Sequence, residues 1–433
     1  MNLLEGIRLY QRKDYLGAVG ILKPLMMHSP NAEIAYYLAS TYMALSDHQQ
    51  AKELYKKAIS LRNDFPEALI NQAICEQHLG ELFQAEQTLQ TLLTHSPQNP
   101  LGTLNLGALL YEQGRPEEAI SYLKVATEHS PQRSEGWFNL GASFLAIGRE
   151  EESLRCLKEA IDCDPHNQAA YIEMAYAQLS GAPQSQAQET LETLISLNPK
   201  HSFARYILAV LSEKNQDFEG AMEHFKHLSF QQYAPWIDSW QFVQESMDDD
   251  SVMLGSTASG FRNLQNLTQL DGLCIELGVR FGNSLRLLQK YTQKEWHGFD
   301  TFQGLPTNWH ELPQGSYSTG GHIPALGDKI RLYPGRFTYT LPEFIPKKEG
   351  PISILHVDCD LYESTYDALC LLNMWIRPGT IIIFDEFLMN EHWRQDEYKA
   401  WIECAQKFGW KAKYVSYSLF SGQVVLQITS TQR

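Results

Sequence analysis

The 433-residue sequence has no cluster of basic residues. No run of five or more lysines and arginines occurs, and 51 acidic residues outnumber 35 basic ones, for a net charge of −16. Such a chain offers no general electrostatic attraction to nucleic acid or to anionic membranes. It also has no stretch of 18 apolar residues, the length that a membrane-spanning helix needs. We therefore expect a protein that binds neither nucleic acid nor membrane.

The features of secreted and zinc-binding chains are missing as well. The seven cysteines form no C-x-x-C pair, so neither a zinc site nor a disulfide framework is indicated. The first residues, MNLLEGIRLYQRKDYLG, contain Glu, Arg and Lys where a signal peptide has an uninterrupted apolar segment. These absences predict a cytoplasmic protein, and the length allows two or three domains.

The first half of the chain repeats itself every 34 residues. Small residues recur in phase at Ala51, Ala85, Ala119, Ser153, Ala187 and Ala221, and large apolar residues follow four positions later at Tyr55, Leu89, Leu123, Leu157, Leu191 and Phe225. Residues four apart share one face of a helix. The small residue would let two antiparallel helices approach, and the large one would fill the space between them. Gly80, Gly114 and Gly148 mark the turns between the helices.

These residues resemble the tetratricopeptide repeat (TPR), whose first-helix pattern is matched by Trp137, Leu140, Gly141 and Phe144. In-phase copies at 32–65, 66–99, 100–133, 134–167, 168–201 and 202–229 follow a first copy, 1–31, that is one residue out of phase. The resemblance implies an all-α solenoid over residues 1–229, of about seven helical hairpins. Its concave groove would bind a peptide or protein partner or mediate self-association. A spacer without a binding role is the alternative.

Residues 230–254 predict a capping helix and a linker. Trp236, Trp240 and Phe242 would seal the last hairpin, because a solenoid needs a final element with one solvated face. An aromatic ligand box is the alternative interpretation of these three residues.

From about residue 250, short apolar strands alternate with helical segments, which is typical of a mostly parallel sheet covered on both faces. We assign a domain to residues 255–433. Seven strands are predicted at 272–278, 295–299, 329–333, 352–357, 380–384, 412–417 and 423–428, with helices at 282–291, 363–376 and 393–408. Because ligands bind beyond the carboxyl ends of strands in such folds, polar residues at those ends are site candidates.

The first two strands end in residues that suit a nucleoside cofactor. Glu276, Gly278 and Gly282 form an E-x-G-x-x-x-G turn that opens a helix, and a helix N-terminus can face an anion. An ordinary strand-to-helix turn would look the same. Asp300 ends the next strand 22 residues after Gly278, a distance at which an acidic residue accepts hydrogen bonds from a ribose. Together these residues favour an adenosine cofactor.

Two further strands end in carboxylates. Asp358 follows the strand at 352–357, and Asp385 and Glu386 follow the strand at 380–384. Parallel pairing would place them side by side, where they repel one another unless a cation joins them. Because oxygen ligands suit Mg²⁺, we predict a magnesium site at Asp358, Asp385 and Glu386. We assign Asp360 and Glu363 to the start of the next helix, where an acidic residue stabilises the helix N-terminus.

Five segments together resemble the class I S-adenosylmethionine (SAM)-dependent methyltransferases of the macrocin and mycinamicin sugar O-methyltransferase (TylF) type: CIELGVRFGNS, HGFDTFQGLP, YPGRFTYTLP, ILHVDCDLYESTYDAL and GTIIIFDEF. The resemblance implies a Rossmann-like α/β domain with a mostly parallel, seven-stranded sheet. It places Glu276, Gly278 and Ser284 beside the methionine part of SAM, Asp300 on the ribose, and Mg²⁺ on Asp358, Asp385 and Glu386. Further cofactor-binding candidates are Gly282, Asn283, Phe302 and Asp358. The family commonly has an aspartate where Glu386 stands, so this ligand stays open.

The catalytic base also stays open. His392 follows the strand that bears Asp385, and His310 and His322 lie in the Gly- and Pro-rich connection 303–328. This connection predicts a lid over the substrate, with a disordered connector as the alternative. With Asp358 as the metal ligand that acts on the substrate hydroxyl, these histidines complete the catalytic candidates.

The predicted function is SAM- and Mg²⁺-dependent O-methylation of a hydroxyl on a sugar or another small-molecule natural product. The repeats would recruit a partner or carrier or mediate self-association. Two alternatives are a protein methyltransferase whose substrate the repeats deliver, and a TPR scaffold with a non-catalytic methyltransferase fold.

Overall fold

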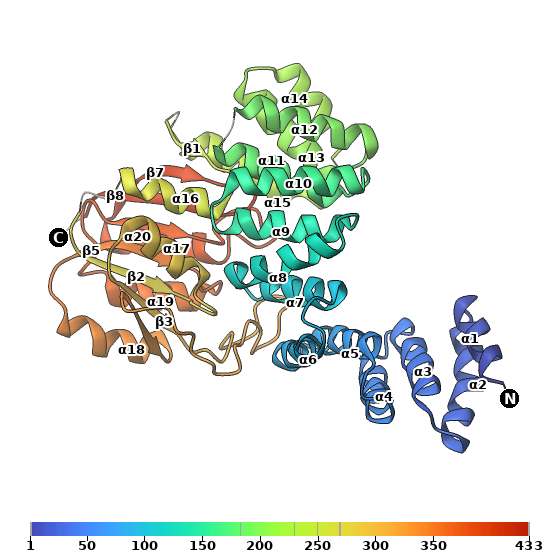
Figure 1. The fold of residues 1–433 in the computed structure, drawn as a ribbon. Coiled ribbons are helices and arrows are strands. Elements are labelled where there is room, and N and C mark those ends of the chain that lie inside the picture. Colours follow the sequence, from blue (N-terminus) through green and yellow to red (C-terminus); the bar gives the residue numbers. More distant parts are fainter. Residues whose placement is uncertain (1, 182, 229, 249, 268–269, 432–433) are drawn as a thin grey trace. The chain divides into compact units, whose positions relative to one another are not determined.

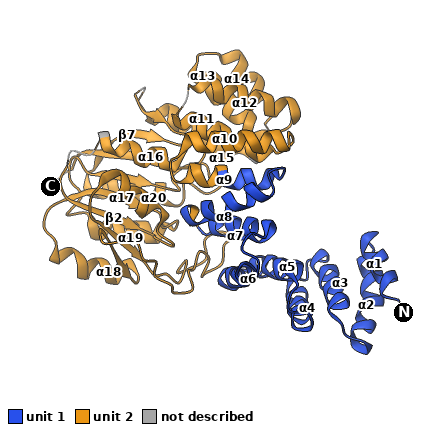
Figure 2. Ribbon diagram, viewed as in Figure 1, with its two compact units in different colours: residues 1–113, 117–140 blue, residues 114–116, 141–433 orange. Residues whose placement is uncertain are grey.

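The computed structural model describes residues 2–181, 183–228, 230–248, 250–267 and 270–431 (Figure 1). The chain forms two compact units (Figure 2), one of residues 1–113 and 117–140 and the other of residues 114–116 and 141–433. The division falls within the repeats, and the predicted domain boundaries at 229 and 254 stay a prediction. No helix in the described part of the chain has both the length and the apolar character needed to cross a membrane.

Within the described residues, the repeats form seven helical hairpins. Their helices are α1 (Leu3–Gln11) and α2 (Tyr15–His28), α3 (Ala32–Ala44) and α4 (His48–Leu61), α5 (Pro66–His78) and α6 (Leu82–His95), α7 (Pro100–Glu112) and α8 (Pro116–His129), α9 (Ser134–Ala146) and α10 (Glu150–Cys163), α11 (Gln168–Gly181) and α12 (Gln184–Leu197), and α13 (Ser202–Lys214) and α14 (Phe218–Phe225).

The hairpins pack through the residues that recur every 34 positions. Each in-phase small residue from Ala51 to Ala221 is buried, as are Tyr55, Leu89, Leu123, Leu157 and Leu191. The turn glycines Gly80, Gly114 and Gly148 have φ of 75°, 73° and 70°, a conformation that costs glycine little and other residues more. The predicted TPR solenoid is confirmed.

The α/β part contains a mixed sheet of eight strands within the described residues. They are β1 (Val252–Met253), β2 (Leu273–Leu277), β3 (Trp296–Asp300), β4 (Ile330–Pro334), β5 (Ile352–Val357), β6 (Ile381–Phe384), β7 (Lys411–Tyr417) and β8 (Val424–Ser430). The order is β1-β7-β8-β6-β5-β2-β3-β4. The predicted number of seven strands is corrected, because the two-residue β1 pairs in parallel with the outer edge of β7. β8 runs antiparallel to β6 and β7.

The chain order of the strands reverses between β2 and β5. The sheet grows from β2 through β3 to β4 in one direction and from β5 through β6 toward β7 in the other. Since parallel connections are right-handed, α17 (Asn283–Thr292) lies on one face and α18 (Phe337–Phe344), α19 (Tyr362–Leu372) and α20 (Glu397–Phe408) lie on the other. α16 (Thr257–Asn263) packs beside α17. Ligand sites of such sheets lie at this point of reversal.

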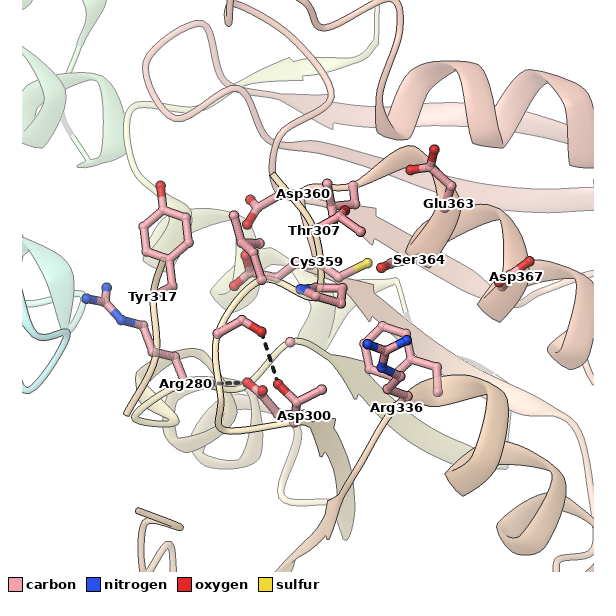
Figure 3. A pocket seen from close by; sticks show the side chains of 18 of the residues that line it. Arg280, Asp300, Thr307, Tyr317, Arg336, Cys359, Asp360, Glu363, Ser364 and Asp367 are labelled. Carbon is pink, nitrogen blue, oxygen red and sulfur yellow. Dashed lines mark hydrogen bonds between the residues drawn. The ribbon is translucent and has the colours of Figure 1, made fainter. Parts of the chain in front are cut away.

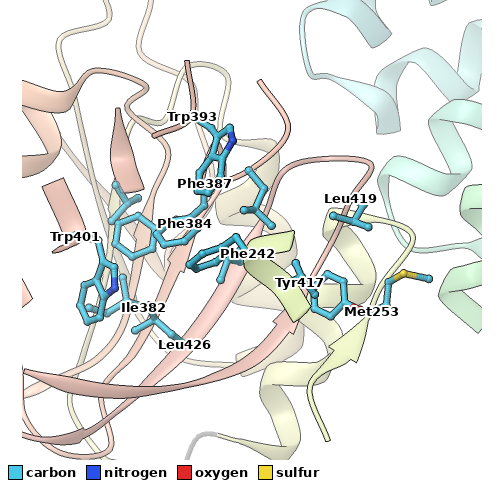
Figure 4. Packing of buried hydrophobic residues seen from close by; sticks show 14 of the residues in the cluster. Phe242, Met253, Ile382, Phe384, Phe387, Trp393, Trp401, Tyr417, Leu419 and Leu426 are labelled. Atoms are coloured by element: carbon cyan, nitrogen blue, oxygen red, sulfur yellow. The ribbon is translucent and has the colours of Figure 1, made fainter. Parts of the chain in front are cut away.

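Helix α15 (Phe230–Ser246) joins the last hairpin to the sheet. Trp236 packs on Phe203 and Tyr206 of α13, as predicted for a capping residue. The expectation for Phe242 is wrong, because its ring packs against Phe387 and Trp393 of the α/β part (Figure 4). One continuous apolar core therefore runs from the hairpins α11–α14 through α15 into the sheet.

Candidate active site

A cavity of about 820 Å³ opens at the carboxyl ends of β2, β3, β5 and β6, at the point where the strand order reverses. Its volume is within the range of roughly 300–1,000 Å³ that is typical of cofactor and small-molecule sites. Figure 3 shows Asp360 and Tyr317 near one end and Arg336 near the other. The lining residues are Gly278, Val279, Arg280, Asp300, Thr301, Gly304, Leu305, Pro306, Thr307, Asn308, Tyr317, Arg336, Phe337, Thr338, Asp358, Cys359, Asp360, Leu361, Glu363, Ser364, Asp367 and Glu386.

The loop after β2 forms one wall of the cavity and is held by Asp300. Oδ2 of Asp300 accepts hydrogen bonds from the backbone N–H groups of Val279 at 2.8 Å and Arg280 at 2.7 Å, and Oδ1 accepts one from Phe302 at 2.7 Å. Gly278 has φ of 90°, and a Cβ at this position would collide with the carbonyl oxygen of Asp358. The loop can thus pass close to β5 only with glycine here. Asp300 fixes two loops at once, and its carboxylate still lines the cavity.

A cluster of carboxylates gathers at the ends of β5 and β6. Burial and the neighbouring Asp385 raise the pKa of Asp358 well above its usual range. The same two causes raise the pKa of Asp360 to about 7 and that of Glu386 to about 8. Burial, together with these acids, also raises the pKa of Glu397. The raised pKa values mean that nearby positive groups do not compensate the negative charge of these carboxylates.

Asp360 does not cap helix α19, so the capping role predicted for it is wrong. The residue that precedes α19 is Leu361, whose side chain makes no capping hydrogen bond. Asp360 has φ of 60°, and this left-handed conformation is compatible with aspartate. Its side chain lines the cavity instead. Glu363 lies in the first turn of α19, as predicted.

Behind the cavity, Glu276 and Asp385 flank a buried histidine. His356 Nδ1 lies 2.7 Å from Glu276 Oε1, and His356 Nε2 lies 3.9 Å from Asp385 Oδ1. Gln423 donates a hydrogen bond to Asp385 Oδ1 at 3.0 Å. Glu276 has no exposed area and is not a lining residue of the cavity. Its predicted contact with the cofactor stays a prediction.

Two of the three candidate bases stack on each other. The rings of His310 and His392 lie 3.9 Å apart between centroids, and His310 Nε2 lies 2.9 Å from Asp396 Oδ2. The negative charge of Asp396 contributes to the raised pKa values of Asp360 and Glu386. His322 is exposed in the long connection. The structure thus brings His310 and His392 together beside the carboxylate cluster.

The long connection predicted as a lid has a defined path within the described residues. Leu305 N donates to Ser316 O at 2.9 Å, and Gly321 N donates to Phe302 O at 2.9 Å. Tyr317 from this segment reaches the cavity, where the Arg280 guanidinium carbon lies 5.3 Å from the centre of its ring. Leu326 covers Gly282, since a Cβ on this glycine would collide with the leucine.

The predicted site residues fall into two groups. Gly278, Asp300, Asp358 and Glu386 line the cavity, whereas Gly282, Asn283, Ser284 and Phe302 are outside its lining, as is Asp385. Tyr317 belongs to the connection 303–328 that is predicted as a lid, and it lines the cavity. Arg280, Asp396 and Glu397 are not predicted as site residues from the sequence. Asp396 and Glu397 fall in the helix predicted at 393–408, where acidic residues are ordinary. Their position eleven residues after Asp385-Glu386 is the signal that could have pointed to them.

The carboxylate cluster has the chemistry of a site for a hard cation, although its geometry is not that of a formed metal site. All its donors are oxygens, which Mg²⁺ prefers. Glu397 Oε1 is buried without a hydrogen-bond partner among the described residues. Among the described residues, no group of three or more His, Cys, Asp or Glu side chains is already arranged to hold a metal. The donors fit Mg²⁺ by type and charge.

The fold and site define an α/β domain with a cofactor-sized cavity, preceded by helical repeats. A model of the family described as macrocin O-methyltransferase (TylF) matches residues 321–406, and a tetratricopeptide repeat model matches residues 42–104, 84–143 and 110–179. A demethyldecarbamoylnovobiocin O-methyltransferase from Streptomyces niveus is 33% identical over 188 residues, covering 35% of this chain and 70% of that protein. The chain thus belongs, through its α/β domain, to the macrocin O-methyltransferase family, and this domain is a methyltransferase domain.

Other similarities cover smaller parts. The 8-demethyl-8-(2,3-dimethoxy-alpha-L-rhamnosyl)-tetracenomycin-C 4'-O-methyltransferase of Streptomyces olivaceus is 38% identical over 65 residues, which are 15% of this chain and 24% of that protein. The chain therefore spans about a quarter of this relative. A solved structure of PilF from Pseudomonas aeruginosa is 20% identical and covers 50% of this chain and 97% of that chain, with a TM-score of 0.45.

Proposed function

We propose that the protein is a SAM- and Mg²⁺-dependent O-methyltransferase that acts on a hydroxyl of a sugar or of another small natural product. The observation that carries the proposal is the cavity at the point of strand reversal, which is lined by Gly278, Asp300, Asp358 and Glu386. The strand order supports a Rossmann-like methyltransferase fold. Both methyltransferase relatives are named as O-methyltransferases, and one is named for a rhamnosyl-tetracenomycin substrate.

The loop after β2 and the end of β3 would hold SAM. Gly278 lets the backbone come close to the ligand, and Asp300 keeps the Val279 and Arg280 amides in place while offering its remaining lone pairs to a ribose. SAM supplies an electrophilic methyl group on sulfur. The protein's task is then to align the acceptor oxygen with that methyl, which contributes on the order of 7–11 kcal/mol at best.

The carboxylates of Asp358, Asp385 and Glu386 would hold Mg²⁺, which supplies a Lewis acid for the acceptor hydroxyl. Asp360 and Glu397 belong to the same cluster, and burial raises the pKa of both carboxyl groups. The His356 imidazole, whose Nε2 lies 3.9 Å from Asp385 Oδ1, would supply positive charge beside the cluster and orient the Asp385 carboxylate.

The acceptor proton needs a base, and the arrangement favours the pair of His310 and His392. A carboxylate that holds one ring nitrogen orients the imidazole and stabilises its protonated form, as Asp396 does for His310. We therefore rank His310 together with His392 as bases and place His322 after them.

The TPR array would bind a peptide or protein partner, such as a carrier of the acceptor, or a second copy of the chain. The two alternatives are a protein acceptor delivered by the repeats and a non-catalytic domain. A protein methyltransferase must bind SAM, whereas a non-catalytic domain need not. Titration calorimetry of the full chain with SAM, with Mg²⁺ and with EDTA, should show binding of SAM. Absence of SAM binding would refute both enzyme hypotheses.

A further inference from the structure

The acidic loop, which we define as residues 385–397, runs from the end of β6 to the first residue of α20 and carries much of the carboxylate cluster. It contains Asp385, Glu386, Asp396 and Glu397 and has no helix or strand of its own before Glu397. A loop of this kind would hold its carboxylates in place only if other elements fixed its backbone. The contacts that do so come largely from α15 and the last repeats.

Helix α15 bonds to the backbone of the acidic loop at its middle. The Met389 N–H donates to Ser239 Oγ at 2.9 Å, and the Ser239 hydroxyl donates to Pro235 O at 2.8 Å. Ser239 has no exposed area. Met389 has φ of 75°, a conformation that is unfavourable for a residue other than glycine. The hydrogen bond from α15 thus stabilises a turn that the free loop would rarely adopt.

A second pair of contacts from α15 holds the loop further on. Arg394 donates from Nε and Nη2 to the two oxygens of Asp238 at 2.6 and 2.8 Å. One turn later Phe242 packs on Trp393, with ring centroids 5.5 Å apart (Figure 4). Bidentate pairs of this kind fix direction as well as distance. Three residues of α15, Asp238, Ser239 and Phe242, therefore hold the acidic loop.

The repeats also reach Asp385 through the turn before β8. Phe420 packs on Tyr176 of α11, at 4.3 Å between ring centroids, and on Phe203 of α13, at 6.0 Å. In the same turn, Gly422 O accepts a hydrogen bond from Leu388 N at 3.0 Å, and Gln423 Nε2 donates to Asp385 Oδ1 at 3.0 Å. Two separate routes thus connect repeat-side residues with the carboxylate cluster.

We propose that the last repeats and α15 are positioning elements of the methyltransferase site, which fix the acidic loop so that its carboxylates face the cavity. The proposal rests on the proposed function for its catalytic meaning. Ser239 and Asp238 are the positioning residues. In this arrangement the repeats do more than recruit a partner, because a ligand that shifts α13 or α15 would change the affinity of the acidic loop for a metal ion.

The test uses the full chain with Ser239→Ala and the matched control Ser180→Ala. Ser180 lies on the repeat helix α11 and donates a hydrogen bond to Ser256 Oγ at 3.0 Å, outside the acidic loop. Three quantities are measured: deuterium exchange of the acidic loop, Mn²⁺ affinity by electron paramagnetic resonance, and SAM affinity by calorimetry.

We expect Ser239→Ala to speed exchange in the acidic loop and weaken Mn²⁺ binding, each by about tenfold, which corresponds to loss of ~1.4 kcal/mol. SAM affinity should stay within about twofold, and Ser180→Ala should match the wild type in all three measurements. Unchanged exchange in Ser239→Ala, equal changes in both variants, or faster exchange without weaker Mn²⁺ binding would each overturn the proposal.

A charge exchange gives a second, independent measurement. Asp238→Arg alone should speed exchange of the acidic loop, and Asp238→Arg combined with Arg394→Asp should restore it, because the ion pair is re-formed in reverse. Failure of the double variant to recover would contradict the positioning role of this pair. Deuterium exchange can be measured without SAM and without turnover. If the wild type did not bind SAM, the proposed function would be refuted, but the exchange data would still show whether α15 fixes the acidic loop.

Discussion

The imidazole of His356 and the carboxylate of Glu276 lie 2.7 Å apart on adjacent strands, and neither side chain has any exposed area. Burial alone would lower the pKa of His356, but the Asp385 and Glu276 carboxylates raise it well above its usual value. Burial also raises the pKa of Glu276. The neighbouring carboxylates therefore favour the charged form of the His356 imidazole, which lies next to Asp385 of the carboxylate cluster.

The pair of Glu276 and His356 should be coupled in stability. Glu276→Leu leaves a buried imidazolium without its partner and should lower the free energy of unfolding by about 3–5 kcal/mol. His356→Leu should also destabilise, and the double variant should cost clearly less than the two single costs added together. Urea denaturation of the four proteins measures this cycle. Additive costs would show that the two side chains do not depend on each other.

Asp300→Asn should weaken SAM binding. The amide replaces one oxygen acceptor with a donor, so the Val279 and Arg280 amides on one side or the Phe302 amide on the other lose their acceptor. Hydrogen bonds to a charged group contribute about 1.5–3 kcal/mol each, so we expect at least tenfold weaker SAM binding by calorimetry. Asp328→Asn, an exposed acid of the long connection, is the control. Equal affinities of the two variants would refute this role for Asp300.

Stability of the metal-free protein should depend on the pH through Glu386. Burial and Asp385 raise its pKa from 4.5 to about 8 in the folded state, so between these values the folded protein binds more protons than the unfolded one. Stability from this group is complete below about pH 4.5 and is lost as the pH rises toward about pH 8. Melting temperatures in EDTA should fall across this window more for the wild type than for Glu386→Gln. Parallel curves would contradict the shifted pKa.

Asp358→Asn and Asp385→Asn should each reduce the affinity for Mn²⁺, used as a spectroscopic substitute for Mg²⁺. Each variant removes a negative oxygen donor of the predicted metal set, and we expect a loss of at least about tenfold, since even neighbours of metal ligands commonly contribute 10- to 100-fold. Asp367→Asn is the control, because Asp367 lines the same cavity outside the carboxylate cluster. Retained affinity in the first two variants would rule out this metal set.

Much of the architecture follows from the sequence because it depends on local periodicity. The small residues from Ala51 to Ala221 and their apolar partners four positions on place the hairpins, since residues four apart share one helix face. The seven predicted strands also appear, because short apolar runs are visible in the sequence. The sequence does not predict β1, because a strand of two residues has no periodic pattern.

The candidate site is predicted only in part. Gly278, Asp300 and Asp358 could be found because a strand end and a loop glycine are visible in the sequence, and all three line the cavity. The sequence position of Asp360, just before a helix, predicts a capping role. Its backbone at φ of 60° turns the side chain to the cavity instead.

The sequence by itself determined the TPR array, the alternating α/β segment and the acidic strand ends, since each depends on residues close in the chain. Only the tertiary structure decided which distant residues meet. The register of β2 and β5 places Glu276 opposite His356, and α15 presents Trp236 to the repeats and Phe242 to the acidic loop. These pairings depend on strand register and on packing between segments far apart in sequence, which local periodicity does not specify.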